Sequence, residues 1–333
     1  MVDDEEGSAE IDPIRPGLDL SFALEKLAQV HAECAKVLVG QDELIDLLVI
    51  GVLAEGHILL EGVPGIAKTL SAKVLAKTLA AEFSRIQFTP DLMPSDIIGT
   101  SIFNLNSSEF EFKKGPIFSN VILIDEINRA PAKTQAALFE VMEEQQVTFD
   151  GETMTMSPPF IVMATQNPIE QEGTYRLPEG QLDRFLMKIN LGYPSETHEV
   201  DILKRFRHQL HKVDLTQIMP VFTKDDIAQL QELVSRIYIE DDILTYISKL
   251  VRATRSHGQI YLGASPRAAL ALMKSAKVAA LLAGRDFVIP DDVQQMASPV
   301  LNHRLILSPT AEIEGIATDQ VIQDVLKTIE VPR

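Results

Sequence analysis

The stretch HILLEGVPGIAKTLSAKVLAKTLAAE, residues 57–82, holds a short apolar run, a loop with two glycines and a helical pattern, in that order. The run HILLE predicts a buried strand, and the segment from Lys68 onward predicts a helix that starts directly from the loop. A loop between a strand and a helix directs backbone N–H groups and the helix N-terminus toward an anion. The stretch therefore predicts a phosphate-binding loop.

The loop departs from the usual pattern, G-x-x-x-x-G-K-[ST], at one position, where Ala67 replaces glycine. Glycine is needed where the backbone takes a positive φ or a ligand passes close to Cα. We expect residue 67 to begin the helix, where alanine is tolerated, so the substitution need not destroy the site. The alternative interpretation of the loop, taken alone, is a strand, a turn and a helix that bind no ligand.

Within this loop, Lys68 is expected to contact the β- and γ-phosphates of a nucleotide, and the hydroxyl of Thr69 is expected to ligate Mg²⁺. The residues predicted to bind the nucleotide here are Gly62, Val63, Pro64, Gly65, Ile66, Ala67, Lys68, Thr69 and Leu70.

Short apolar runs alternate with helical patterns on both sides of the loop. Further strands are predicted in SRIQF, VILIDE, FIVMATQNP and LMKINL. Continuous apolar strands that alternate with helices are typical of a parallel sheet covered on both faces. Two other segments, residues 100–116 and 146–160, each hold two short runs around a turn and predict β-hairpins. The fold class is α/β, with a central parallel sheet between helices.

The chain divides into three parts. Residues 1–18 hold six acids ahead of the first base, which predicts an acidic disordered tail. After Pro194 the strand patterns stop, and five helical patterns follow, several of them with Asp, Ser or Thr at the start. We therefore expect an α/β domain over residues 19–195, carrying the two hairpins, and a helical domain over residues 196–333.

Composition restricts the class of protein. Most of the net charge of −18 lies in residues 1–195, and nucleic-acid-binding proteins usually show a basic surface, so nucleic acid is disfavoured as a partner. No apolar run reaches the roughly 18 residues of a membrane helix, and the acidic start is not a secretory signal peptide. Cys34 is the only cysteine, which excludes an intrachain disulfide and makes a reducing cytoplasm the simplest compartment.

Polar side chains follow two of the predicted strands. Asp125 and Glu126 end the strand VILIDE, and an unpaired buried charge is costly, so packing does not explain them. Asp125 can hold Mg²⁺ through water, and Glu126 can act as general base on the attacking water. The alternative interpretation is that the two acids form an exposed cap at the start of the following helix. Asn167 ends another strand, where its amide can bind the attacking water or the γ-phosphate.

Arg267 lies in the first turn of the predicted helix that follows GASP, with Ser265 as its cap. A cation at this end of a helix opposes the helix dipole. Arg267 is therefore expected to have an anionic partner, and phosphate is the natural one.

In sequence order, Gly62–Thr69, Val121–Glu126, Asn167, Arg184 and Arg267 resemble Walker A, Walker B, sensor 1, arginine finger and sensor 2 of an AAA+ ATPase. More narrowly, the chain resembles the MoxR family in the segments EGVPGIAKT, LIDEINRAPAKTQAALFEVMEE, ATQNPIEQEGTYRLPEGQLDRFL and GASPRA. The resemblance extends from Leu20 to residue 310. That family itself carries AKT in its loop, so Ala67 marks a subfamily. Arg176 departs from the family, which more often has proline there, and we expect no effect on catalysis.

The resemblance implies a P-loop AAA+ core and an all-helical lid domain, assembled into a ring that is commonly a hexamer, with ATP and Mg²⁺ between subunits. Four residues would be catalytic. Glu126 and Asn167 would act at the chain's own ATP, Arg184 would reach the neighbour's site, and Arg267 would act in cis. The two hairpins would be the helix-2 and pre-sensor-1 inserts. The segment that flanks adenine would be Val39, Gly40 and Gln41.

MoxR-type proteins are similar to chaperones that activate partner complexes, often together with a protein that bears a von Willebrand factor A domain. The resemblance therefore implies a client protein as partner. One alternative is a nucleic-acid-acting or chelatase-like AAA+ motor, against which the acidic main domain argues. Another is a scaffold that binds ATP without hydrolysing it, and the intact Glu126, Asn167 and Arg184 argue against that reading.

Overall fold

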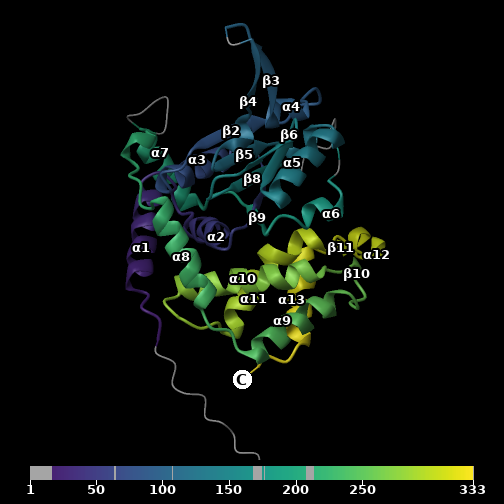
Figure 1. Ribbon diagram of the computed structural model, residues 1–333. Coiled ribbons are helices and arrows are strands. Elements are labelled where there is room, and N and C mark those ends of the chain that lie inside the picture. Colours follow the sequence, from purple (N-terminus) through teal and green to yellow (C-terminus); the bar gives the residue numbers. More distant parts are fainter. Residues whose placement is uncertain are drawn as a thin grey trace, which may run out of the picture.

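The computed structural model describes residues 17–63, 65–106, 108–167, 175, 177–207 and 214–332. The predicted acidic tail over residues 1–18 lies almost wholly outside the described residues, and so does Pro64 of the loop. Figure 1 shows an α/β part that carries the central sheet and, below it, a part built mainly of helices.

The central sheet has five parallel strands in the order β2-β5-β8-β1-β9. The β5 side chains are all buried, because helices cover both faces of the sheet. This confirms the prediction of a central parallel sheet between helices. The strands are β1 (Ile58–Gly62), β2 (Phe83–Gln87), β5 (Val121–Asp125), β8 (Ile161–Gln166) and β9 (Met187–Leu191).

Side chains alternate between the two faces of the sheet. Val121 and Leu123 of β5 belong to one apolar cluster, which holds the first three helices, whereas Ile122 and Ile124 belong to a second cluster with the helix that follows β5. The helices of this part are α1 (Ser21–Ala35), α2 (Asp42–Leu53), α3 (Lys68–Thr78), α4 (Pro94–Ile98), α5 (Ala132–Glu144) and the short α6 (Glu179–Leu182).

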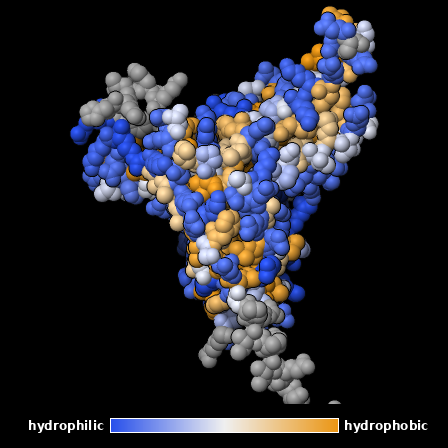
Figure 2. Space-filling view, turned by 60° about the vertical axis from the view of Figure 1, so that its left-hand side comes forward, coloured by the Kyte–Doolittle hydropathy of each residue, from blue (hydrophilic) through white to orange (hydrophobic). Residues whose placement is uncertain are grey.

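The two segments predicted as hairpins form antiparallel pairs. Strand β3 (Gly99–Asn104) pairs with β4 (Glu109–Lys114), and β6 (Gln146–Phe149) pairs with β7 (Glu152–Thr155). The β3–β4 hairpin projects away from the body of the molecule (Figure 1). Figure 2 shows apolar side chains near its tip, where Phe103 and Phe110 are exposed.

The C-terminal part is helical, as predicted, and we refer to it as the lid. It also holds one short antiparallel pair of strands, β10 (Ile260–Leu262) and β11 (Ile306–Leu307), which the sequence analysis did not predict. None of the helices that the structure describes is both long and apolar enough to cross a membrane. The helices after β9 are α7 (Glu196–Phe206), α8 (Lys224–Arg236), α9 (Asp241–Thr254), α10 (Pro266–Leu282), α11 (Pro290–Leu301), α12 (Pro309–Ile313) and α13 (Thr318–Thr328), with a 3₁₀ turn, η4 (Asn302–Arg304), after α11.

A single apolar cluster crosses from the α/β part into the lid. It contains buried residues of α1 and α2 together with residues of α10 and α11. Helix α2 packs against α10 and α8, and α11 packs against β9. The chain changes from strands to helices near residue 195, but the apolar core continues across this point. The domain boundary at residue 195 therefore stays a proposal.

His57, directly before β1, is buried and neutral. The Val162 N–H donates to its Nδ1 atom over 3.0 Å, so the proton is on Nε2, which lies 3.0 Å from the Met142 carbonyl. Burial lowers the pKa of His57 to about 4, although the bond to Met142 opposes the shift. These contacts tie the last turn of α5 to the amino end of β1.

We expect His57 to make the protein sensitive to acid. Because the pKa is lower in the folded chain, the unfolded chain takes up the proton first, and stability is lost as the pH falls from about 6.5 through about 4. A shift of this size corresponds to about 3 kcal/mol at pH 4, at 1.36 kcal/mol per pKa unit. Urea denaturation of wild type and His57→Asn at several pH values measures it. The variant should be less stable at pH 7.5 but should lose less stability on acidification. An equal loss of stability in both proteins on acidification would show that His57 is not the group responsible.

Candidate active site

Several of the predicted site residues meet at the carboxyl edge of the sheet. The strand register aligns Gln87 with Asp125, Glu61 with Gln166, and Gly62 with Leu191. Since all five strands are parallel, the loop after β1, the acidic pair after β5 and the polar end of β8 lie side by side at this edge. Ligands of open α/β sheets bind at such edges.

Gly62 is required by close packing. A Cβ atom at this position would lie 2.3 Å from Ile66 Cδ1 and 2.8 Å from the carbonyl oxygen of Leu191. The Lys68 ammonium group folds back across the loop and donates to the Gly62 carbonyl oxygen over 2.6 Å. The loop is thus compact, and a lysine cation lies within it.

Ala67 corrects the sequence analysis. Helix α3 begins at Lys68, and Ala67 precedes it with φ +61° and ψ 15°, in the left-handed region. The expectation that residue 67 begins the helix, at a position where alanine is tolerated, was wrong. This is the conformation for which the usual pattern has glycine, and it costs roughly 1–2 kcal/mol for a residue with a Cβ atom. Strain of this kind is typical of ligand-binding loops.

The carboxylate of Asp125 is 6% exposed and has two partners. Arg85 Nε of β2 donates to Oδ2 over 2.5 Å, and the Thr165 hydroxyl of β8 donates to Oδ1 over 3.2 Å. The Arg85 cation offsets the cost of burying this charge. Arg85 was not predicted as a site residue, although the polar residues of the strand SRIQF were a usable signal.

Glu126 is more exposed and also takes a left-handed conformation, with φ +58°. Gln87 Nε2 donates to Oε2 of Glu126 over 2.9 Å, and Arg129 Nε lies 2.8 Å from the same oxygen. The Glu126 N–H bonds to the Thr165 hydroxyl over 3.0 Å, so β8 fixes the backbone of the acidic pair. Arg129 thus forms a salt bridge with Glu126 within the chain.

Asn167 follows β8 at the same edge and is buried. The carbonyl oxygen of the preceding residue, Gln166, lies 3.5 Å from Lys68 Nζ, which places Asn167 close to the loop. The structure therefore brings together Lys68, the acidic pair and Asn167 at the carboxyl ends of the strands.

A cavity of about 440 Å³ lies beside the loop, between the α/β part and the lid. Gly40, with φ +62°, faces the ring of His198, which would lie 2.2 Å from a Cβ atom at this position. The buried Oε1 atom of Gln41 has no hydrogen-bond donor among the described residues. The lining includes the predicted Val39, Gly40 and Gln41. It also includes residues that were not predicted, among them Tyr193, His198, Gln295, Ser298 and Asp319.

The carboxyl edge suits a nucleotide with Mg²⁺. Mg²⁺ is usually held by one or two carboxylates together with phosphate oxygens and water, rather than by an all-protein cage. Asp125 is the buried carboxylate here, and Thr69 lies in the first turn of α3. Among the described residues there is no cluster of three or more His, Cys, Asp or Glu side chains that could hold a metal ion alone.

Arg184 and Arg267 lie elsewhere. Both guanidinium groups pair with the carboxylate of Glu143, in the last turn of α5, and Arg184 also donates to the Phe139 carbonyl over 3.2 Å. The bond from His57 to Met142 places this end of α5 at the amino edge of the sheet. Burial and the neighbouring Arg267 charge lower the pKa of Arg184. The sequence held no signal for Glu143 as their common partner.

The position of Arg267 does not fit the expected cis role. The amino and carboxyl edges are separated by the length of β1, roughly 17 Å for five residues at 3.3 Å each. In this conformation Arg267 therefore lies far from its own phosphate-binding loop and next to Arg184. Its anionic partner is the Glu143 carboxylate, whereas phosphate was predicted.

Comparisons with known proteins agree with this arrangement. Residues 57–187 match the family described as "ATPase family associated with various cellular activities (AAA)", and residues 252–325 match an AAA lid domain. The chain is 45% identical to the Chaperone MoxR1 of Mycobacterium tuberculosis over 94% of this chain and 84% of that protein. It is 48% identical to the uncharacterized protein YeaC of Bacillus subtilis over 89% and 92%. A crystal structure of a proposed ATPase from Cytophaga hutchinsonii, 46% identical, superposes with a TM-score of 0.87 over 94% of this chain and 97% of that one.

Proposed function

Since the chain belongs to the MoxR family of AAA+ ATPases, we propose that it hydrolyses ATP with Mg²⁺ in a ring of identical subunits and uses this cycle to remodel or activate a partner protein. The family supports an ATPase with a chaperone-like role. The ring, the partner and the role of each residue are our proposal.

In this proposal the carboxyl edge binds the nucleotide of its own chain. The loop from Gly62 to Leu70 surrounds the phosphates, and Lys68 leaves the Gly62 carbonyl to contact them. Thr69 and Asp125 hold Mg²⁺, which offsets negative charge on the phosphates when it is bound. The cavity takes the adenine, and the unpaired Gln41 Oε1 accepts a hydrogen bond from its amino group.

Glu126 and Asn167 serve the attacking water. Glu126 lies beyond the buried Asp125 at the end of β5, so its carboxylate can accept a proton from water near the γ-phosphate. The amide of Asn167 orients that water from the end of the neighbouring strand. Gln87 and Arg129 hold the Glu126 carboxylate until the nucleotide is in place.

The observation that carries the proposal is the position of Arg184 at the amino edge of the sheet, away from its own loop. An arginine placed there, with its side chain 29% exposed, can contact a nucleotide only if a second copy of the chain brings its carboxyl edge against this surface. Arg267 shares Glu143 with Arg184, so we propose that both arginines act in trans on the neighbour's γ-phosphate. This replaces the cis role expected for Arg267.

The β3–β4 hairpin supports the proposed contact with a client. Its exposed apolar side chains stand away from the body of the protein, where they are available to another polypeptide (Figure 2). A partner with a von Willebrand factor A domain remains the choice suggested by the resemblance to the family. The exposed apolar side chains around this hairpin are Ile102, Phe103, Leu105 and Phe110.

Concentration dependence tests the shared site. ATP turnover per chain should rise cooperatively with protein concentration and should follow the particle mass measured by light scattering in the same samples. A site completed by a neighbour cannot work in the monomer, so turnover at monomer concentrations should be near the detection limit. Turnover per chain that stays constant down to clear monomer would contradict the proposal.

A further inference from the structure

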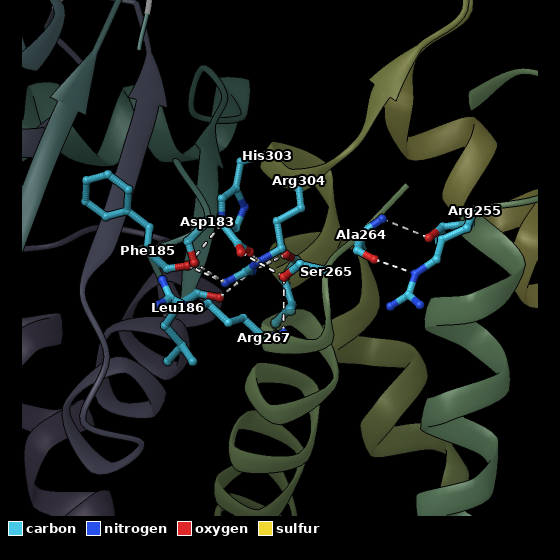
Figure 3. A network of polar contacts seen from close by, with 11 residues as sticks. Asp183, Phe185, Leu186, Arg255, Ala264, Ser265, Arg267, His303 and Arg304 are labelled. Atoms are coloured by element: carbon cyan, nitrogen blue, oxygen red, sulfur yellow. Dashed lines mark hydrogen bonds and ion pairs between the residues drawn. The ribbon is translucent and has the colours of Figure 1, made fainter. Parts of the chain in front are cut away.

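The guanidinium group of Arg304, in the lid, is buried against the segment that carries Arg184. Its Nη1 atom donates to the Leu186 carbonyl over 3.0 Å, and its Nη2 atom donates to the carbonyls of Asp183 and Phe185 over 3.2 and 2.6 Å. Its Nε atom donates to the Asp183 carboxylate over 2.8 Å. Figure 3 shows this group between the segment and helix α10. One lid side chain thus holds the backbone on both sides of Arg184.

Asp183 receives a second bond from the lid. The Ser265 hydroxyl donates to Asp183 Oδ2 over 2.7 Å and accepts a bond from the Arg267 N–H over 3.1 Å, as the N-cap of α10. The carboxylate before Arg184 is therefore bonded to the residue that begins the helix of Arg267 (Figure 3). Asp183 links the two arginines through the backbone, while Glu143 links them through their side chains.

The lid element that holds Arg304 also reaches the nucleotide cavity. Gln295, Ser298 and Pro299 of α11 line that cavity, and the same helix leads directly into η4, which ends at Arg304. Ser298 and Asn302 both bond to Asp319 Oδ1, so the end of α11 is fixed to α13. Helix α11 and η4 thus connect the cavity at one edge of the sheet to the segment of Arg184 at the other.

We propose that Asp183 and Arg304 are positioning residues, which set Arg184 and Arg267 according to the position of the chain's own lid. A nucleotide that moves α11 in one subunit then moves the arginines that this subunit offers to its neighbour, which couples adjacent sites in the ring. The inference rests on the proposed function, because it requires that Arg184 act in trans.

Asp183→Asn is the variant that tests this inference. It keeps the shape of the side chain and removes the charge. Loss of this charge should displace the two arginines, so kcat should fall about 10- to 100-fold, as for a catalytic group displaced by about 1 Å. The variant's own phosphate-binding loop is unchanged. The KM for ATP and the particle mass should stay within about twofold. An unchanged kcat would overturn the inference. Asp226→Asn is the matched control, because the Asp226 side chain is 18% exposed, as is that of Asp183, and pairs with Lys26 at the start of α8, outside α11 and η4.

Rings that contain two kinds of chain distinguish a misplaced Arg184 from a general loss of activity in the variant. Glu126→Gln chains are inactive themselves but carry intact arginines, so adding them in excess to Asp183→Asn chains should raise turnover per Asp183→Asn chain severalfold. Arg184→Ala chains should be rescued in the same way. If Arg184→Ala is rescued and Asp183→Asn is not, the positioning role is overturned while the proposed function stands. If neither is rescued, the trans-acting site itself fails.

Ser265→Ala covers the case in which Asp183→Asn does not fold. It removes one bond to Asp183 and should lower kcat several-fold, with rescue by Glu126→Gln chains. Ser308→Ala is its matched control, because Ser308 caps α12 in the lid without touching Asp183. Equal effects of the two serine variants would show that a lost helix cap explains the result, and would overturn the inference.

Discussion

Glu126→Gln is expected to lower ATP turnover by about 10²- to 10⁴-fold, the usual contribution of a general base. Glutamine has the same shape but cannot accept a proton from water. The loop around Lys68 and the carboxylate of Asp125 are untouched, so ATP should bind with wild-type affinity and stay bound. Because bound ATP completes the contact between subunits in our proposal, the variant should also favour the ring.

Single-turnover hydrolysis and equilibrium binding of a fluorescent ATP analogue measure the two effects of Glu126→Gln separately. Glu232→Gln, an exposed position on α8, is the matched control and should behave as the wild type. Turnover of Glu126→Gln within threefold of the wild type would show that another group activates the water, and would favour a protein that uses ATP as a switch.

Arg184→Ala is expected to bind ATP normally and to lose roughly 10³-fold or more in turnover at concentrations where the ring is present, as for other arginine fingers. Binding is preserved because Arg184 lies at the opposite edge of the sheet from its own loop. Truncation leaves Glu143 paired with Arg267, so the surface keeps one of its two cations.

Turnover and particle mass must be measured in the same samples of Arg184→Ala, because a lost ring would also abolish activity. Arg184→Lys keeps the charge but not the planar fork, and should recover only a small part of the rate. Arg252→Ala, on α9, is the control for loss of an exposed arginine. Full activity of Arg184→Ala within assembled rings would remove Arg184 from the mechanism.

Much of the carboxyl edge could be predicted from sequence because its residues are encoded locally. HILLE, the loop and the helix after it are contiguous, and the acids at 125 and 126 directly follow an apolar run. Parallel strands bring such positions together whatever their order in the sheet. The loop, the acidic pair and Asn167 therefore came together at one edge without knowledge of the sheet order.

Contacts that depend on tertiary arrangement were not predictable in the same way. Arg85 meets Asp125 only because β2 lies beside β5, and this strand order follows from packing rather than from local pattern. Glu143 and Arg267 are separated by 124 positions in the chain. The conformation of Ala67 was missed for a different reason, since an alanine in a helical pattern gives no sign that its backbone is left-handed.

The apolar cluster that runs from α1 and α2 into α10 and α11 has a consequence for how this protein could have evolved. Recombination at the boundary near residue 195 would join a lid to a core whose contact surface had diverged separately. Substitutions on α2 are instead expected to require matching ones on α10, since the two helices pack against each other. We therefore expect the two parts to have evolved together, even though the chain passes from strands to helices between them.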